Sequence, residues 1–336
     1  MRRILLIYPG GLGDILFSRV VLASLKHHYP EVKIDYAGMP QYLHLLSEEL
    51  YQIIDYNDRR LLPLFSPSSA LNKECLTWLN EYDGIIFWSS AQLTEHVTQK
   101  LNNLKKPAVI SASVTPLPNQ KEHVALIMLR TIARWGIKPT AERLHQLAVL
   151  QPNFPVGVNH PAMKMMNNYI VVHPGSGSKK KNWPISQFLK LMPWLEQQFH
   201  TRVVCILGPA ETNCHTILNK TNCHWVAPKD VFELADWLKG AQFYLGNDSG
   251  VTHLAAQLGC QTFVLFVSTN PVHWRPLGQN VFVITNYTPV ANEQGFYFCP
   301  DLTITNVATI IQQNIPLRFS TTAPNKTLPD GSKTPS

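Results

Sequence analysis

Short apolar runs alternate with helix-like segments along most of the chain, and this pattern is typical of a parallel α/β protein. Ile4–Tyr8 is a continuous apolar run, and a helical pattern extends from Asp14 to about His28. A second run, Val32–Tyr36, completes a strand–loop–helix–strand unit, which favours a doubly wound sheet. We also predict strands at Gly84–Trp88 and Ala108–Ser111, a loop at 59–72, and a helix from Lys121 to Trp135 that ends at Gly136.

The same alternation begins again after residues 151–168, which are rich in Pro, Asn and Gly and predict a linker. Strands are predicted at Tyr169–His173, Val203–Leu207, Phe243–Leu245, Thr262–Val267 and Val281–Thr285, and helices at about Ser186–Phe199, Val231–Leu238 and Gly250–Leu258. Residues 318–336 hold three prolines and one leucine and predict a disordered tail. We therefore expect two α/β domains, 1–155 and 156–317, with a ligand cleft between them.

Composition narrows the class of protein. The chain has 336 residues and is 45% hydrophobic, which is enough for two ordinary cores. Its net charge is +7 without a polybasic arm, which disfavours a nucleic-acid binder and allows an anionic ligand or membrane surface. No apolar stretch approaches the roughly 20 residues of a membrane span. The first apolar run is too short for a signal peptide, so a cytoplasmic location is expected.

Cysteine spacing predicts no metal site. The six cysteines contain no Cys-x-x-Cys pair. Cys205 and Cys260 lie in or beside apolar segments and are predicted to be core residues. Cys214-His215 and Cys223-His224 match no standard spacing of metal ligands, so no metal is expected there.

The first candidate site is Gly10-Gly11-Leu12-Gly13-Asp14, which follows the first predicted strand. Its glycines (Gly10, Gly11 and Gly13) allow a tight turn and a close approach of the backbone to a ligand. Asp14 fits either a helix-capping aspartate or a general base that faces a cleft.

A nicotinamide-dependent Rossmann oxidoreductase is an alternative for this segment. The dinucleotide-binding pattern G-x-G-x-x-G is incomplete, because Leu16 occupies its third glycine position. Asp35, after the second strand, would nevertheless suit a ribose.

Two further segments each join a predicted strand to a predicted helix. His173–Pro184 has small residues that expose backbone amides and then three lysines, which suits phosphate binding without matching a Walker A loop. The alternative there is a solvated basic loop. In Gly246–His253, the amides near Ser249 and Gly250 would hold an anion at a helix N-terminus. The alternatives are helix capping by Asp248 or Ser249 and a core role for the histidine.

These three segments, in this order and spacing, resemble glycosyltransferase family 9, the bacterial heptosyltransferases of lipopolysaccharide core assembly. The resemblance covers about residues 1–315. The specific part is the pair His-Pro-Gly-Ser-Gly…Lys-Asn-Trp-Pro and Gly-Asn-Asp-Ser-Gly…His. Phe266–Pro271 resembles a later loop of the family, of the type Gly-x-Thr-Asp-Pro, in which Val267 and Asn270 replace the usual Gly and Asp.

The resemblance implies a GT-B fold, in which two Rossmann-like, doubly wound domains face a central cleft. The N-terminal domain would take the acceptor, and the C-terminal domain would take the nucleotide sugar. The family's catalytic base falls on Asp14, its diphosphate-binding lysine on Lys181, its phosphate-side hydroxyl on Ser176 and a nucleotide contact on Glu211. The remaining contacts to the sugar donor fall on Asp248, Ser249, Gly250 and His253.

The implied reaction is an inverting transfer of a heptose, or a related sugar, from a nucleotide-diphosphate donor such as ADP-heptose to an anionic glycolipid of the lipopolysaccharide core. Such a transfer needs a base for the acceptor hydroxyl and charge stabilisation for the leaving diphosphate. The chain has no Asp-x-Asp, the usual carboxylate pair for a nucleotide-bound divalent ion, so we expect no metal and no cofactor. The mild basic charge fits peripheral contact with the inner membrane. A non-catalytic nucleotide-sugar-binding protein is the other alternative, which Asp14 and Lys181 disfavour.

Arg130 and Arg134 are candidates for acceptor binding. They lie one turn apart on the predicted helix 121–135 and would share a face. Planar guanidinium groups suit the phosphates or carboxylates of an acceptor. The alternative is a solvated helix face.

Overall fold

The computed structural model describes residues 1–66, 70–102, 104, 107–117, 120–138, 168–208, 211, 223–287 and 295–315. The chain divides into two compact units, Met1–Ala148 and Val149–Ser336. The predicted linker, the predicted boundary at residue 155, the predicted tail and Cys214-His215 lie outside the described residues, apart from residue 168. No helix within the described ranges is long and apolar enough to cross a membrane.

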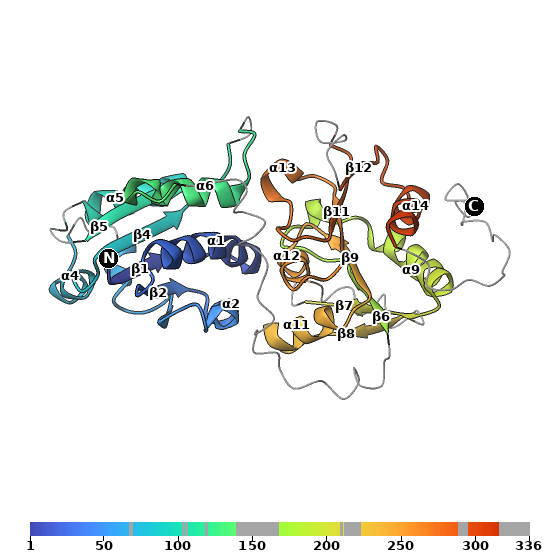
Figure 1. The fold of residues 1–336 in the computed structure, drawn as a ribbon, viewed down its shortest axis with the longest axis horizontal. Coiled ribbons are helices and arrows are strands. Elements are labelled where there is room, and N and C mark those ends of the chain that lie inside the picture. The colour runs from blue at the N-terminus through green and yellow to red at the C-terminus, as the bar shows by residue number, and fades with distance from the viewer. Residues whose placement is uncertain are drawn as a thin grey trace. The chain divides into compact units, whose positions relative to one another are not determined.

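Unit 1 is built on five parallel strands in the order β3-β2-β1-β4-β5 (Figure 1). Its elements are β1 (Arg3–Ile7), α1 (Leu12–His28), β2 (Lys33–Gly38), α2 (Pro40–Leu43), η1 (His44–Leu46), β3 (Gln52–Asp55), α3 (Leu62–Phe65), α4 (Lys73–Leu79), β4 (Gly84–Ser89), α5 (Ala91–Leu101), β5 (Ala108–Ser113), α6 (Val124–Thr131) and η2 (Ile132–Trp135). The strand order reverses direction between β1 and β4. In open α/β sheets, ligands bind outside the carboxyl ends of the strands at such a point.

The core of unit 1 holds β1 and β4 in place. Leu5 and Ile7 of β1 and Ile85 and Phe87 of β4 are fully buried on one face of the sheet, because alternate residues of a strand share a face. Helices α3, α4 and α5 cover this face with Leu64, Trp78, Leu79, Val97 and Leu101. Helix α1 covers the other face together with α6, against which it packs. Burial of each large aliphatic side chain contributes about 2 kcal/mol, so the carboxyl end of β1 is rigidly supported.

Unit 2 repeats this plan with seven parallel strands in the order β12-β11-β10-β9-β6-β7-β8. Its elements are β6 (Tyr169–His173), η3 (Lys179–Lys181), α9 (Ile185–Phe199), β7 (Arg202–Ile206), β8 (His224–Val226), α11 (Val231–Lys239), β9 (Phe243–Asn247), α12 (Gly250–Gln257), β10 (Thr262–Phe266), α13 (Pro271–Trp274), β11 (Val281–Thr285), β12 (Phe296–Phe298) and α14 (Ile304–Asn314). The order reverses between β6 and β9, where His173 pairs with Gly246. The loops that follow these two strands therefore emerge side by side.

The core of unit 2 lies on both faces of the central strands. On one face, Ile170 and Val172 of β6 and Leu245 of β9 pack with side chains of α9 and α14. On the other face, Val264 and Phe266 of β10 pack with Ala256 of α12. Because both faces are covered, β6, β9 and β10 are continuous apolar runs in the sequence.

Most of the predicted elements are confirmed within a few residues, and the departures have local causes. The helix predicted from Lys121 begins instead at Val124, because the His123 side chain accepts a hydrogen bond from the amide of Ala125 and caps the helix there. It becomes a 3-10 helix at Ile132 and ends at Gly136, as predicted. The loop predicted at 59–72 contains the short helix α3, which buries Leu64.

The carboxylate of Asp35 is buried in the sheet of unit 1 and is paired with other side chains there. Asp35 is the third residue of β2 and pairs in register with Leu5, which places it away from the carboxyl end of the strand. Its Oδ2 accepts hydrogen bonds from Arg3 Nη2 at 2.8 Å and from Tyr82 Oη at 2.8 Å, and the residue is fully buried. The prediction of a ribose contact at Asp35 is therefore wrong, because its carboxylate is committed to a buried ion pair.

Candidate active site

Asn247, the last residue of β9, holds both ends of the loop that follows β6. Its side chain is fully buried. Oδ1 accepts a hydrogen bond from the amide of Trp183 at 2.9 Å, and Nδ2 donates to the carbonyl of Pro174 at 2.7 Å. Asn247 therefore fixes where the segment between Pro174 and Trp183 begins and ends.

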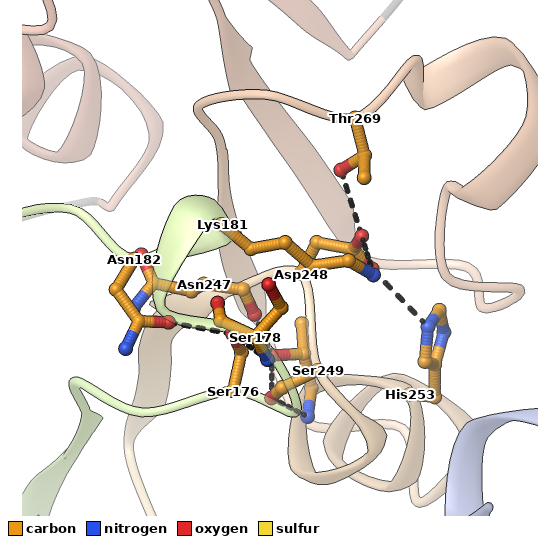
Figure 2. Close-up of polar contacts among 10 residues, drawn as sticks. Ser176, Ser178, Lys181, Asn182, Asn247, Asp248, Ser249, His253 and Thr269 are labelled. Atoms are coloured by element: carbon orange, nitrogen blue, oxygen red, sulfur yellow. Dashed lines mark hydrogen bonds and ion pairs between the residues drawn. The ribbon is translucent and has the colours of Figure 1, made fainter.

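The middle of this loop is shaped by Ser176. Its Oγ lies 2.5 Å from Asn182 Oδ1 and 2.8 Å from the carbonyl of Ser178, and it accepts from the amide of Ser178 at 3.2 Å. These contacts keep the loop compact around the short helix η3. Lys181 is the last residue of η3, and its side chain extends toward Asp248 (Figure 2).

Asp248 is the centre of the site. Its Oδ2 lies 2.9 Å from Lys181 Nζ and accepts a hydrogen bond from Thr269 Oγ1 at 2.7 Å. Its Oδ1 lies 3.6 Å from His253 Nε2. The Asp248 side chain is 3% exposed and that of Lys181 is 31% exposed, so one end of the ion pair is buried and the other faces solvent. Figure 2 shows the three partners converging on the carboxylate from η3, from α12 and from the loop after β10.

These partners keep Asp248 ionised. Burial by itself would raise the pKa of Asp248. The hydrogen bond and charge of His253, followed by the charge and hydrogen bond of Lys181, outweigh burial and lower this pKa from 3.8 to about 2. The Asp248 carboxylate therefore stays negatively charged and holds the ammonium group of Lys181.

Helix α12 begins directly after Asp248. Ser249 is its N-cap, and Ser249 Oγ accepts from the amide of Thr252 at 3.4 Å. The predicted capping role is thus confirmed for Ser249, whereas Asp248 uses its carboxylate elsewhere. The first amides of a helix have no partner within the helix, so the amides at Gly250 and Val251 give this end a partial positive charge.

Glu211 lies against the loop that follows β6. Its Oε2 accepts from the amide of Gly208 at 2.6 Å. A Cβ atom at position 175 would lie 1.9 Å from its Oε1, so a larger residue there would displace the Glu211 carboxylate. Burial lowers the pKa of His173, and this effect outweighs the charge of Glu211, which would raise that pKa. His173 therefore stays neutral and donates from Nδ1 to the carbonyl of Ile206 at 3.0 Å.

The glycine segment of unit 1 brings Asp14 to the carboxyl end of β1. Asp14 Oδ2 accepts from the amide of Gly11 at 2.9 Å, which is a helix-capping contact. A Cβ atom at Gly10 would lie 2.5 Å from Asp14 Cβ and 2.9 Å from the Tyr8 ring, so close packing explains this glycine. Burial, the charge of Asp14 and a hydrogen bond to Asp14 raise the pKa of Tyr8, which keeps its phenol protonated.

The prediction that Arg130 and Arg134 lie one α-helical turn apart is wrong. Arg130 lies in α6, whereas Arg134 lies in the 3-10 helix η2, which has a different periodicity. Arg130 Nη2 lies 2.5 Å from Glu122 Oε1, and both arginines are exposed.

Thr269 and Asn247 are two site residues for which the sequence predicts no role. Neither type is specific for catalysis, and their partners lie 21 and 64 residues away along the chain. The signal in the sequence for Thr269 is its place within the family-like loop Phe266–Pro271. Trp274 of α13 is a third, because Lys181 Nζ lies 5.9 Å from its ring centroid. Among the described residues, no group of three or more His, Cys, Asp and Glu is arranged to hold a metal ion.

Comparisons with a family model, with known proteins and with solved structures agree with one another. Residues 139–295 match the family model of glycosyltransferase family 9 (heptosyltransferase). The chain is 22% identical over 304 residues to lipopolysaccharide heptosyltransferase 3 of Escherichia coli K12, covering 80% of this chain and 83% of that protein.

Two solved structures share its GT-B fold. A glycosyltransferase family 9 protein of Veillonella parvula superimposes with a TM-score of 0.67 at 15% identity, covering 93% of this chain and 97% of that one. ADP-heptose lipopolysaccharide heptosyltransferase II of E. coli superimposes with a TM-score of 0.64 at 20% identity, covering 94% and 98%.

Because Asp248 is ionised in the folded protein, we expect its contribution to the free energy of unfolding to depend on pH. A carboxyl group whose pKa is lowered by folding stabilises the protein above its unfolded pKa, and this is lost as the pH falls through the folded pKa. The shift from 3.8 to about 2 corresponds to roughly 2 kcal/mol. Asp248→Asn should therefore lower the free energy of unfolding by about that amount at pH 7, and the difference from wild type should shrink between pH 4 and pH 2.

Urea unfolding followed by tryptophan fluorescence at several pH values measures this difference. Asp230→Asn is the matched control, because Asp230 is an exposed helix cap in the same unit. A difference between Asp248→Asn and wild type that is the same at pH 7 and pH 3 would contradict the assignment.

Proposed function

We propose that the chain is a member of glycosyltransferase family 9, whose model matches residues 139–295, and that it transfers a heptose, or a related sugar, from ADP-heptose to an anionic glycolipid of the lipopolysaccharide core, with inversion at the transferred carbon. The observation that carries the proposal is the pair Lys181–Asp248 beside the N-terminus of α12, at the point where the strand order of unit 2 reverses. This is the position at which open α/β sheets bind nucleotides.

The diphosphate of the sugar donor is assigned to Lys181 and α12. Lys181 supplies an ammonium group on a partly exposed side chain, and α12 adds the amides of Gly250 and Val251. Both stabilise the negative charge that develops on the leaving diphosphate. Asp248 is too buried and too negative to approach a phosphate, so its part in binding is to hold Lys181.

The nucleotide and the phosphate side are assigned to residues around Gly175. The Glu211 carboxylate is fixed beside this glycine and suits the hydroxyls of a ribose. Ser176 is assigned to the phosphate side from the family resemblance, and its Oγ contacts Asn182 Oδ1 and the amide of Ser178 within the same loop. His253 is assigned to the sugar-donor site through Asp248, whose Oδ1 lies 3.6 Å from its Nε2.

Asp14 is proposed as the general base that takes the proton of the acceptor hydroxyl. It lies at the carboxyl end of β1, beside the point where the strand order of unit 1 reverses. Its carboxylate accepts from the amide of Gly11 and from the Tyr8 phenol, and a carboxylate has acceptor capacity beyond two hydrogen bonds. Capping and base catalysis are therefore compatible roles.

Acceptor binding is assigned to unit 1, because the sugar donor is assigned to unit 2. We do not base this assignment on Arg130, because Glu122 pairs with it. Arg134 lies in the 3-10 helix η2, so the argument that it shares a helix face with Arg130 no longer holds. An anionic glycolipid acceptor, together with the net charge of +7, supports peripheral action at the cytoplasmic face of the inner membrane.

The Lys181 assignment is tested by an alanine substitution at this position and at its neighbour. Lys181→Ala removes a charge-assisted contact, so ADP affinity should fall about 10- to 100-fold and transfer should slow with it. Lys180→Ala is the matched control, because Lys180 is exposed in the same short helix. Calorimetric titration with ADP measures both. Equal losses in the two variants would indicate a diffuse basic loop instead of a diphosphate site.

The base assignment is tested by Asp14→Asn. The amide keeps an oxygen that can accept from Gly11, so the helix cap and the unfolding midpoint should be preserved. Turnover should fall about 10²- to 10⁴-fold, while ADP affinity stays near the wild-type value. Steady-state transfer kinetics and ADP titration on the same preparation separate the two effects. Near-normal turnover would reduce Asp14 to a helix cap.

Metal independence is proposed from the residues available for the diphosphate. The sequence has no Asp-x-Asp, and cationic and amide groups are present where a divalent ion would otherwise act. Transfer should persist at its full rate in excess EDTA. Loss of transfer in EDTA, restored by magnesium or manganese, would overturn this part of the proposal.

A further inference from the structure

Thr269 shares an acceptor atom with Lys181. Thr269 Oγ1 donates to Asp248 Oδ2 over 2.7 Å, and Lys181 Nζ contacts the same oxygen over 2.9 Å. Figure 2 shows the threonine reaching this oxygen from the loop after β10, while His253 faces the carboxylate from α12. The carboxylate is therefore held from three elements of the fold.

The loop that carries Thr269 is itself anchored. In the parallel pairing of β10 with β9, Leu265 lies opposite Asn247, so the loop leaves the same edge of the sheet as Asp248. Asn270 Oδ1 accepts from the amide of Val272 at 2.9 Å and caps α13. A threonine on an anchored loop has little freedom, because β-branching also restricts its side-chain rotamers.

From this geometry we propose that Thr269 is a positioning residue for Lys181: it fixes the orientation of the Asp248 carboxylate and thereby the place at which the ammonium group meets the sugar donor's diphosphate. The inference rests on the proposed diphosphate role of Lys181. It assigns Thr269 no contact with the sugar donor.

The need for such a holder follows from the chemistry of lysine. Its ammonium is a point charge on a flexible four-carbon stem, so its position is set by its partners. An aspartate carboxylate can rotate about its last bond, and a fixed hydroxyl donor on Oδ2 removes that freedom. Without Thr269, the ion pair remains but its geometry varies, and part of the free energy of diphosphate binding is used to order it.

The test is a double-mutant cycle with ADP as the probe. Thr269→Val keeps the shape of the side chain and removes the hydroxyl, and it should weaken ADP binding about 3- to 10-fold, the loss of one hydrogen bond to a charged group. Thr269→Ser restores the hydroxyl and should bind ADP within about twofold of wild type. In a Lys181→Ala background, Thr269→Val should have no further effect, because the residue acts through Lys181.

Thr262→Val is the matched control. Thr262 is buried at the opposite end of β10, and its hydroxyl donates to the carbonyl of Cys260 at 2.9 Å, so its loss should leave ADP affinity unchanged. Thermal unfolding of each variant confirms folding. A full loss of affinity from Thr269→Val in the Lys181→Ala background, no loss in the wild-type background, or no rescue by serine would each overturn the inference.

The proposed function fails in a different way. In that case ADP affinity would be the same with and without Lys181, or ADP would not bind to the wild-type protein. The cycle separates these results from a failure of the positioning role, in which Lys181→Ala weakens binding but Thr269→Val acts independently of it.

Discussion

The buried carboxylate of Asp248 is the constraint on which the arrangement of unit 2 depends. A charge at 3% exposure must be paired and hydrogen-bonded, because an unpaired buried charge costs several kcal/mol. Three segments far apart in the sequence supply its partners: the basic loop after β6, the first turn of α12 and the loop after β10. Satisfying one carboxylate therefore brings together the groups that surround the proposed diphosphate site.

This arrangement links fold to chemistry through the order of the strands. The reversal between β6 and β9 leaves two neighbouring loops at the carboxyl edge of the sheet, and Asn247 ties them to each other. Lys181 is then held at the edge by Asp248, with about a third of its side chain exposed (31%). A cation held in advance of binding stabilises a leaving diphosphate without reorganisation during the reaction. In unit 1, the same reversal places Asp14 at the end of β1.

The sequence predicted the strands around each reversal and the three loops of the candidate site, because buried parallel strands are apolar runs and glycine-rich turns follow them. It did not predict the edge strands β3, β8 and β12, which are short and have exposed or half-buried residues. It also could not predict that Thr269 and Asn247 complete the site. Both depend on side-chain contacts across different strands, which local patterns do not encode. The ribose contact at Asp35 failed for the same reason, whereas the shared turn of Arg130 and Arg134 failed because the helix becomes a 3-10 helix at Ile132.

Thermal unfolding with nucleoside diphosphates tests the central claim most directly, since a ligand that binds the folded state raises its apparent stability by mass action. With ADP at about 100 times its dissociation constant, the account predicts a stabilisation of roughly 2.7 kcal/mol, seen as a rise in the unfolding temperature of the wild-type protein. The rise should be preserved in Asp14→Asn and fall to about 0.4–1.4 kcal/mol in Lys181→Ala, because that variant is expected to bind ADP 10- to 100-fold more weakly. A rise that survives Lys181→Ala unchanged, or no rise with ADP, UDP or GDP, would contradict the account.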